Sequence, residues 1–120
     1  MSWVRVPFDD GGRARSVTPI DVDGRRLVAW RDEFGGLHLG DARCPHQWAD
    51  LATEGIVLDG ELVCTAHGWR FDSEGTGSKV NVQGRRDRKT GIDSPAWRPV
   101  PGGLEIDLPV SDDTASTALG

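Results

Sequence analysis

The chain has 120 residues, a formal net charge of −5 and a mean hydropathy of −0.43. This length fits one domain with a modest core, and the acidic balance disfavours binding to nucleic acid. No apolar run is long enough to cross a membrane, and the N-terminus lacks the apolar stretch of a secretory signal. We therefore expect a soluble, cytoplasmic protein, whereas the oligomeric state cannot be predicted.

Short apolar or β-branched runs alternate with turn signals along the chain, a pattern typical of strands. The turn signals are Asp23-Gly24, Gly35-Gly36, Asp59-Gly60, Glu74-Gly75 and Gly102-Gly103. The strands predicted between them cover residues 3–6, 15–22, 26–31, 37–42, 56–58, 61–65, 69–71, 96–100 and 104–108. Only residues 49–53 are expected to form one helical turn. The pattern predicts an all-β fold, a small antiparallel sandwich or barrel.

Two stretches are predicted to lie outside the regular strands. Residues 73–93 are polar and glycine-rich, and we expect a long exposed loop that contains Lys79 and the basic run Arg85–Lys89. This run either keeps the loop solvated or docks on an acidic rim of a partner, and both interpretations stay open. Residues 110–120 are small and polar, which predicts a disordered C-terminal tail and a folded domain over residues 1–109.

Two short motifs combine a cysteine with a histidine. Cys44-Pro45-His46 is followed, after 17 residues, by Cys64-Thr65-Ala66-His67, and each motif lies at the end of a predicted strand. A lone structural disulfide is disfavoured in the cytoplasm. Two loops that face each other would offer two sulfur and two nitrogen ligands, which fits a tetrahedral zinc site or a [2Fe–2S] centre with cysteines on one iron and histidines on the other. A structural role without any metal is the third interpretation.

The spacing and the flanking run Gly68-Trp69-Arg70-Phe71-Asp72 resemble the Rieske family. This resemblance implies a Rieske-type antiparallel β-sandwich or barrel with two cluster-binding loops. It also implies one [2Fe–2S] cluster per chain, in which Cys44 and Cys64 hold the buried iron while His46 and His67 hold the outer iron. One cysteine and one histidine per loop is the arrangement by which each loop reaches both irons.

Other residues near the motifs have simpler interpretations. His38 is predicted to be a surface residue, because its neighbours Leu37 and Leu39 would face the core. Trp48 and Trp69 fall inside the two loops, where they either shield the cluster from water or simply pack.

The resemblance also separates kinds of Rieske protein. The respiratory kind has a disulfide between its loops, at positions that Ala49 and Ala66 occupy here, and a membrane anchor. A catalytic oxygenase needs a mononuclear iron held by two histidines and a carboxylate, and only His38 remains for it. The start at Met1 and the polar end favour a whole chain over an excised domain.

The implied function is a soluble Rieske-type ferredoxin, a one-electron carrier between a NAD(P)H-linked reductase and a terminal oxygenase, which is not an enzyme on its own. The alternative is a small Rieske subunit with a structural or redox-sensing role in an oxidoreductase complex. High-potential relatives carry serine and tyrosine hydroxyls at the positions of Trp69 and Phe71, so we expect a potential in the lower half of the family range. Neither nucleic acid nor a membrane is expected as a partner.

Overall fold

The computed structural model describes residues 3–45 and 49–108. The chain divides into two compact units, one built from its two ends and the other from residues 10–94. His46 and Trp48 lie outside the described residues, as do residues 109–120, so the proposed domain boundary and the disordered tail stay predictions.

The unit built from the chain ends is one antiparallel sheet of three strands. Its order is β1 (Trp3–Pro7), β11 (Gly103–Asp107) and β10 (Trp97–Val100). The turn between β10 and β11 uses Gly102 at φ +73°, a left-handed conformation that glycine adopts without a Cβ clash. The guanidinium of Arg98 lies 4.1 Å from the ring centroid of Trp3, which is a cation–π contact.

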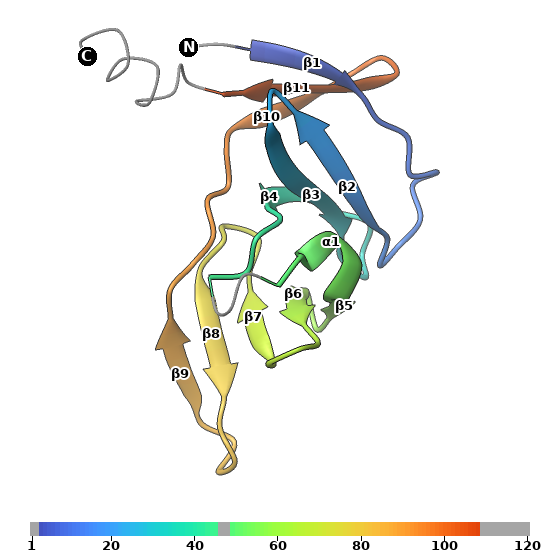
Figure 1. The fold of residues 1–120 in the computed structure, drawn as a ribbon. Coiled ribbons are helices and arrows are strands. Elements are labelled where there is room, and N and C mark those ends of the chain that lie inside the picture. Colours follow the sequence, from blue (N-terminus) through green and yellow to red (C-terminus); the bar gives the residue numbers. More distant parts are fainter. Residues whose placement is uncertain (1–2, 46–48, 109–120) are drawn as a thin grey trace, which may run out of the picture. The chain divides into compact units, whose positions relative to one another are not determined.

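The unit of residues 10–94 contains two antiparallel sheets and one short helix (Figure 1). The first sheet has the order β2 (Val17–Val22), β3 (Arg25–Arg31), β4 (Leu37–Asp41). The second has the order β5 (Gly55–Leu58), β6 (Glu61–Cys64), β7 (Trp69–Phe71), β8 (Gly77–Val80), β9 (Arg86–Lys89). The helix α1 (Leu51–Glu54) matches the predicted helical turn within two residues. The all-β prediction is confirmed, and no helix in the described ranges is long and apolar enough to span a membrane.

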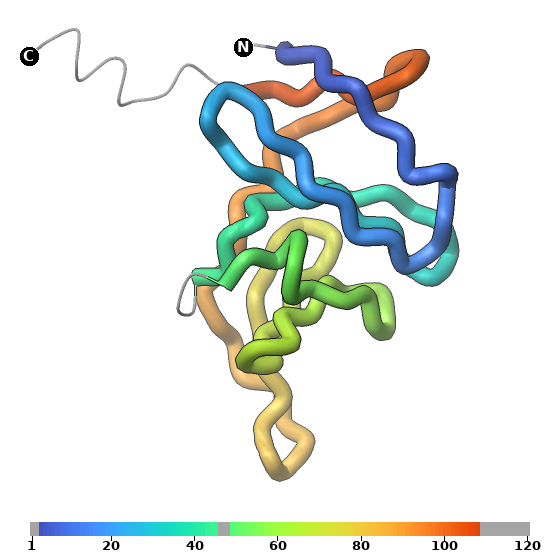
Figure 2. The backbone as a smooth tube through the Cα atoms, turned by 45° about the vertical axis from the view of Figure 1, so that its right-hand side comes forward, coloured from blue at the N-terminus to red at the C-terminus, as the bar shows by residue number. Residues whose placement is uncertain are grey.

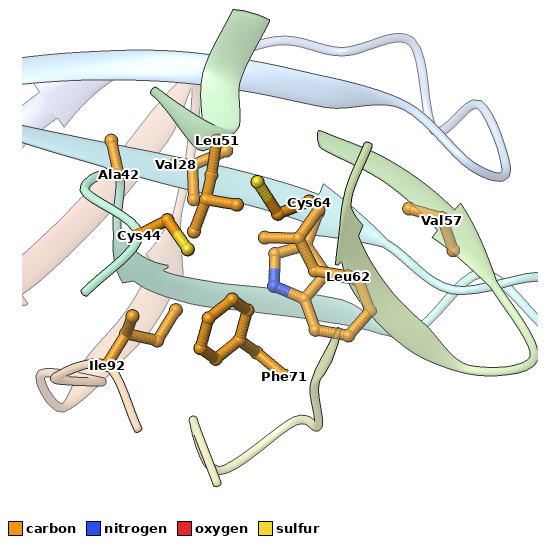
Figure 3. Packing of buried hydrophobic residues seen from close by; sticks show 10 residues of the cluster. Val28, Ala42, Cys44, Leu51, Val57, Leu62, Cys64, Phe71 and Ile92 are labelled. Atoms are coloured by element: carbon orange, nitrogen blue, oxygen red, sulfur yellow. The ribbon is translucent and has the colours of Figure 1, made fainter. Parts of the chain in front are cut away.

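The core of this unit lies between its two sheets. Strand β3 contributes Val28 and Trp30. The five-stranded sheet contributes Val57, Leu62 and Phe71, which are labelled in Figure 3. Both cysteines belong to the same cluster of buried residues. Because β3 is buried on both faces, its run of four buried residues, Leu27–Trp30, does not alternate between core and solvent as a surface strand would.

The predicted loop over residues 73–93 is wrong in its middle, where the chain forms the β8–β9 hairpin. Its strands pair from Gly77 with Lys89 to Val80 with Arg86. Figure 2 shows this hairpin, in yellow and orange, extending beyond the rest of its sheet. In the turn, the side chain of Asn81 accepts hydrogen bonds from the N–H groups of Gln83 and Arg85, both at 3.0 Å.

His38 is not the plain surface residue that its alternation predicts. Its ring lies 4.5 Å from the ring of Trp30, its partner across β3 and β4, and its Nε2 lies 2.8 Å from the carboxylate of Asp32. Leu39 is buried as predicted, whereas Leu37 is only half-buried. Since β3 is covered on both faces, the neighbouring strand β4 is also partly covered on both faces.

Candidate metal centre

The first candidate loop begins where β4 ends and leads into α1. The N–H of Cys44 donates to the carbonyl of Ala49 at 2.8 Å, and the N–H of Leu51 donates to the carbonyl of Ala42 at 2.6 Å. These two bonds close the loop at its base. Cys44 is fully buried there, and Leu51, which is also fully buried, packs in the same core cluster.

Asp50 fixes the far end of this loop. Its carboxylate accepts hydrogen bonds from the N–H of Ala52 and the hydroxyl of Thr53, so it caps the start of α1. The same carboxylate takes a two-pronged hydrogen bond from Arg26 on β3, with the shortest distance at 3.0 Å. The Arg26 guanidinium, followed by the Thr53 and Ala52 bonds, holds the pKa of Asp50 below its ordinary value. As an ionised group, Asp50 therefore connects the loop to the sheet of β2, β3 and β4.

The second candidate loop joins β6 to β7. The N–H of Gly68 donates to the carbonyl of Cys64 at 2.7 Å, which closes a tight turn, and Gly68 stands at φ +77°. This left-handed conformation favours glycine at the position directly after His67. Cys64 is fully buried, while His67 is half-buried with its Nδ1 atom buried.

The second loop is hydrogen-bonded to the helix that follows the first loop. Thr65, next to Cys64, donates both its N–H and its hydroxyl to the carbonyl of Glu54, at 2.9 and 2.7 Å. Glu54 ends the helix that follows the first loop. The sequence alone did not predict this link. The cap by Asp50 could have been predicted from the run Asp50-Leu51-Ala52-Thr53, because aspartate is a preferred residue at the start of a helix.

Three of the four predicted ligands lie in the described ranges, and they come from two adjacent loops. Cys44 and Cys64 share one core cluster and form no disulfide with each other (Figure 3). Residues 3–45 and 49–108 contain no group of three or more metal-binding side chains that could hold one ion. His46, the fourth predicted ligand, lies outside those ranges, so its place at the site stays a prediction.

The donors that are present fit an iron–sulfur centre. Two buried thiols supply soft sulfur, and the buried Nδ1 of His67 supplies an imidazole nitrogen. The sulfur donors are fully enclosed, but the histidine keeps part of its surface in solvent. This difference fits a cluster whose sulfur-bound iron is shielded and whose imidazole-bound iron lies nearer the surface.

Trp69 lies beside the second loop, half-buried and packed against the core cluster. The Nζ atom of Lys89 lies 5.8 Å from the centroid of its ring. Its proposed role in shielding a cluster from water stays a prediction.

Comparison with known proteins identifies the family. The Rieske [2Fe-2S] domain family matches residues 2–94, and the chain therefore belongs to this family. Membership implies an iron–sulfur cluster as the bound group.

Relatives and solved structures of this family differ in length. The 4beta-methylsterol monooxygenase of Methylococcus capsulatus is 37% identical over 79 residues, which cover 66% of this chain and 21% of the relative. Dicamba monooxygenase has a TM-score of 0.73 at 22% identity, over 88% of this chain and 33% of its own. The ferredoxin of carbazole 1,9a-dioxygenase from Nocardioides aromaticivorans has a TM-score of 0.70 at 21% identity, over 88% of this chain and 97% of its own.

The two structural likenesses show the fold alone. The chain spans about a fifth of the curated monooxygenase that it matches.

Proposed function

We propose that this chain is a soluble, cytoplasmic Rieske-type ferredoxin that carries single electrons from a NAD(P)H-linked reductase to a terminal oxygenase. The joint burial of Cys44 and Cys64 in one core cluster carries this proposal. Two fully buried thiols without a disulfide support a cluster that is held away from water. Membership of the Rieske family supports the same assignment.

In this proposal, Cys44 and Cys64 hold the inner iron, and His46 and His67 hold the outer iron. When bound, the cluster supplies a site that takes up and releases one electron. The chain's own residues exclude water from the sulfur side, where Leu51 and Phe71 are fully buried. The half-buried His67 provides the natural exit for the electron, since it joins the buried site to the surface.

A ferredoxin of known structure shares this fold. The ferredoxin of carbazole 1,9a-dioxygenase is matched over nearly its whole length. The partner oxygenase is proposed because the curated relatives include oxygenases, among them the oxygenase subunit of 5,5'-dehydrodivanillate O-demethylase.

A second candidate function is the electron-entry domain of a larger oxygenase. It is favoured by the identity of 37% to a monooxygenase that is about five times longer than the matched segment. In this case the electron would pass to a mononuclear iron in the same assembly rather than to a separate protein.

An anaerobic redox titration followed by enzymatic reduction tests the proposal. We expect one electron per chain to be taken up reversibly, and a NADH-dependent flavin reductase to reduce the protein within seconds. A centre that takes up one electron from dithionite but from none of several flavin reductases would contradict the role as a carrier. That result would favour the structural or redox-sensing alternative.

A further inference from the structure

The β8–β9 hairpin is basic in an otherwise acidic chain. Between Gly77 and Lys89 the hairpin carries five cationic side chains and one carboxylate, although the formal charge of the whole chain is −5. The outer strand β9 is an edge of its sheet, and charged residues on an edge strand prevent pairing with other chains. This protective role accounts for charge on the edge, but it does not account for where the lysines lie.

Not all five cations are available to a partner. Arg86 donates to Glu61 on β6 at 2.8 Å and to the hydroxyl of Ser78 at 2.7 Å, so it is used within the sheet. Lys79 and Lys89 form no ion pair within 4.0 Å among the described residues. Neither ammonium group is therefore held by a carboxylate in direct contact, although Asp87 lies opposite Lys79 in the strand register.

Both lysines lie beside the second candidate loop. A Cβ atom added to Gly68 would lie 4.0 Å from Cε of Lys79, and Nζ of Lys89 lies 5.8 Å from the Trp69 ring centroid. The strand register explains this placement, because Trp69 on β7 pairs with Lys79 on β8. Gly68 and Trp69 directly follow His67, so the two lysines lie near the proposed exit of the electron.

These two residues are also the only lysines in the sequence. The remaining twelve cationic residues are arginines. A lysine carries a compact, strongly hydrated charge on a flexible stem, so it can meet a carboxylate without a fixed geometry. All of the chain's side-chain amines therefore gather at one place.

We propose that Lys79 and Lys89, together with Gly68 and Trp69 beside them, form the docking surface for an acidic patch on a protein redox partner. This inference rests on the proposed role as an electron carrier and adds the position and the charge of the contact. A protein fits better than a nucleic acid, because the carboxylate of Asp87 lies opposite Lys79 in the strand register and the chain as a whole is acidic. Opposite charges at this site would steer the partner to the exit and raise the association rate.

Oxidation of the reduced protein by hexacyanoferrate(III) measures the charge at the exit. One electron passes from the reduced centre to the trianion, which becomes hexacyanoferrate(II). A uniformly acidic protein would repel the trianion. The rate of its oxidation would then rise with added salt, because salt screens the repulsion. We expect the rate to fall with added salt, because near 0.1 M salt the Debye length of about 10 Å makes the nearest charges dominate.

Matched variants assign the effect to the lysines. The double variant Lys79→Gln/Lys89→Gln should react at least about threefold more slowly near 0.1 M salt, and Lys79→Arg/Lys89→Arg should keep the wild-type rate. Arg13→Gln/Arg15→Gln removes the same charge from the connection before β2 and should change the rate little. A wild-type rate that rises with salt, or equal losses in both glutamine variants, would overturn the inference.

Amine labelling gives a second result that does not need the cluster. Acetic anhydride modifies Lys79, Lys89 and the terminal amine, and mass spectrometry reports each site. Poly-L-glutamate should protect both lysines more than the terminal amine. Equal protection of all three amines, or stronger protection by a single-stranded oligonucleotide of the same charge, would overturn the docking of an acidic protein. Iron analysis of the same sample separates this outcome from a failure of the proposed function, which would appear as a missing cluster.

Discussion

Glu61 on β6 accepts a hydrogen bond from Arg86 on β9 at 2.8 Å, although two strands lie between them in the sheet. Its other carboxylate oxygen accepts from Arg70 on β7 at 2.9 Å. The side chain of Glu61 is 15% exposed, and that of Arg70 is 16% exposed. This carboxylate therefore binds the projecting hairpin to the middle of its sheet.

Replacement of Glu61 by glutamine should weaken this connection. We expect Glu61→Gln to lower the free energy of unfolding by about 1–2 kcal/mol, because charge-assisted hydrogen bonds are stronger than neutral ones and the partly exposed Arg86 is screened by water. Urea denaturation measures the change. Glu105→Gln, which breaks the single exposed pair with Arg98, is the control and should cost less. Equal losses in the two variants would contradict the bridging role.

Asp50 should support the first loop. We expect Asp50→Ala to destabilise the protein by about 1–2 kcal/mol, since it removes a helix cap and a partly exposed ion pair. The iron should also be released faster to a chelator, because the loop would lose its tie to β3. Asp50→Asn keeps an acceptor for the cap and should be less affected. An unchanged rate of iron release in Asp50→Ala would show that the loop does not depend on this residue.

Asp32 should contribute a stability that depends on pH. The hydrogen bond with His38, followed by the bond from the N–H of Gly36, lowers the pKa of Asp32. A carboxyl group whose folded pKa is lowered stabilises the fold above its unfolded pKa, and this contribution is lost as the pH falls through the folded value. Wild type should therefore exceed Asp32→Asn in unfolding free energy at pH 7, and the difference should shrink below about pH 4. A difference that stays constant down to pH 3 would refute this linkage.

Phe71 should influence the reduction potential. Its side chain is fully buried in the cluster of side chains that contains both cysteines. Phe71→Tyr adds a hydroxyl, and a hydrogen bond to sulfur would stabilise the more negative reduced state and raise the potential. We expect a rise of tens of millivolts, because one hydrogen bond to a charged group contributes at most about 1.5–3 kcal/mol. Protein-film voltammetry measures it, and a lower midpoint with the cluster intact would contradict the expected contact.

The sequence contains a turn signal from which the β8–β9 hairpin could have been predicted. Three turns share the pattern Asx-x-x-Gly, beginning at Asp32, Asp72 and Asn81. In each, the side chain accepts from the N–H groups two and four residues later. The closing glycines, at positions 35, 75 and 84, have φ values of +91°, +85° and +81°. The strands beside the third turn were not predicted, because this projecting, solvated hairpin carries basic residues in place of the alternating apolar residues that indicate a strand.

The candidate ligands could be proposed from the sequence because the motif that suggests them is local. A cysteine and a histidine two or three residues apart suggest a metal-binding loop without any knowledge of the fold. The contacts that hold the loops are not local: Asp50 lies 24 residues from Arg26, and Thr65 lies 11 residues from Glu54. The environment of His38 was unpredictable for the same reason, since it depends on the covering of both faces of β3.

The proposed function depends on the identity of the bound group. Metal and sulfide analysis of protein purified without denaturation determines that identity directly. We predict about two irons and about two acid-labile sulfides per chain, with no stoichiometric zinc. Cys64→Ala should lose both, and the matched variant Ala66→Ser, in the same loop, should keep them. Stoichiometric zinc without sulfide would contradict the [2Fe–2S] assignment and the electron-carrier function that rests on it.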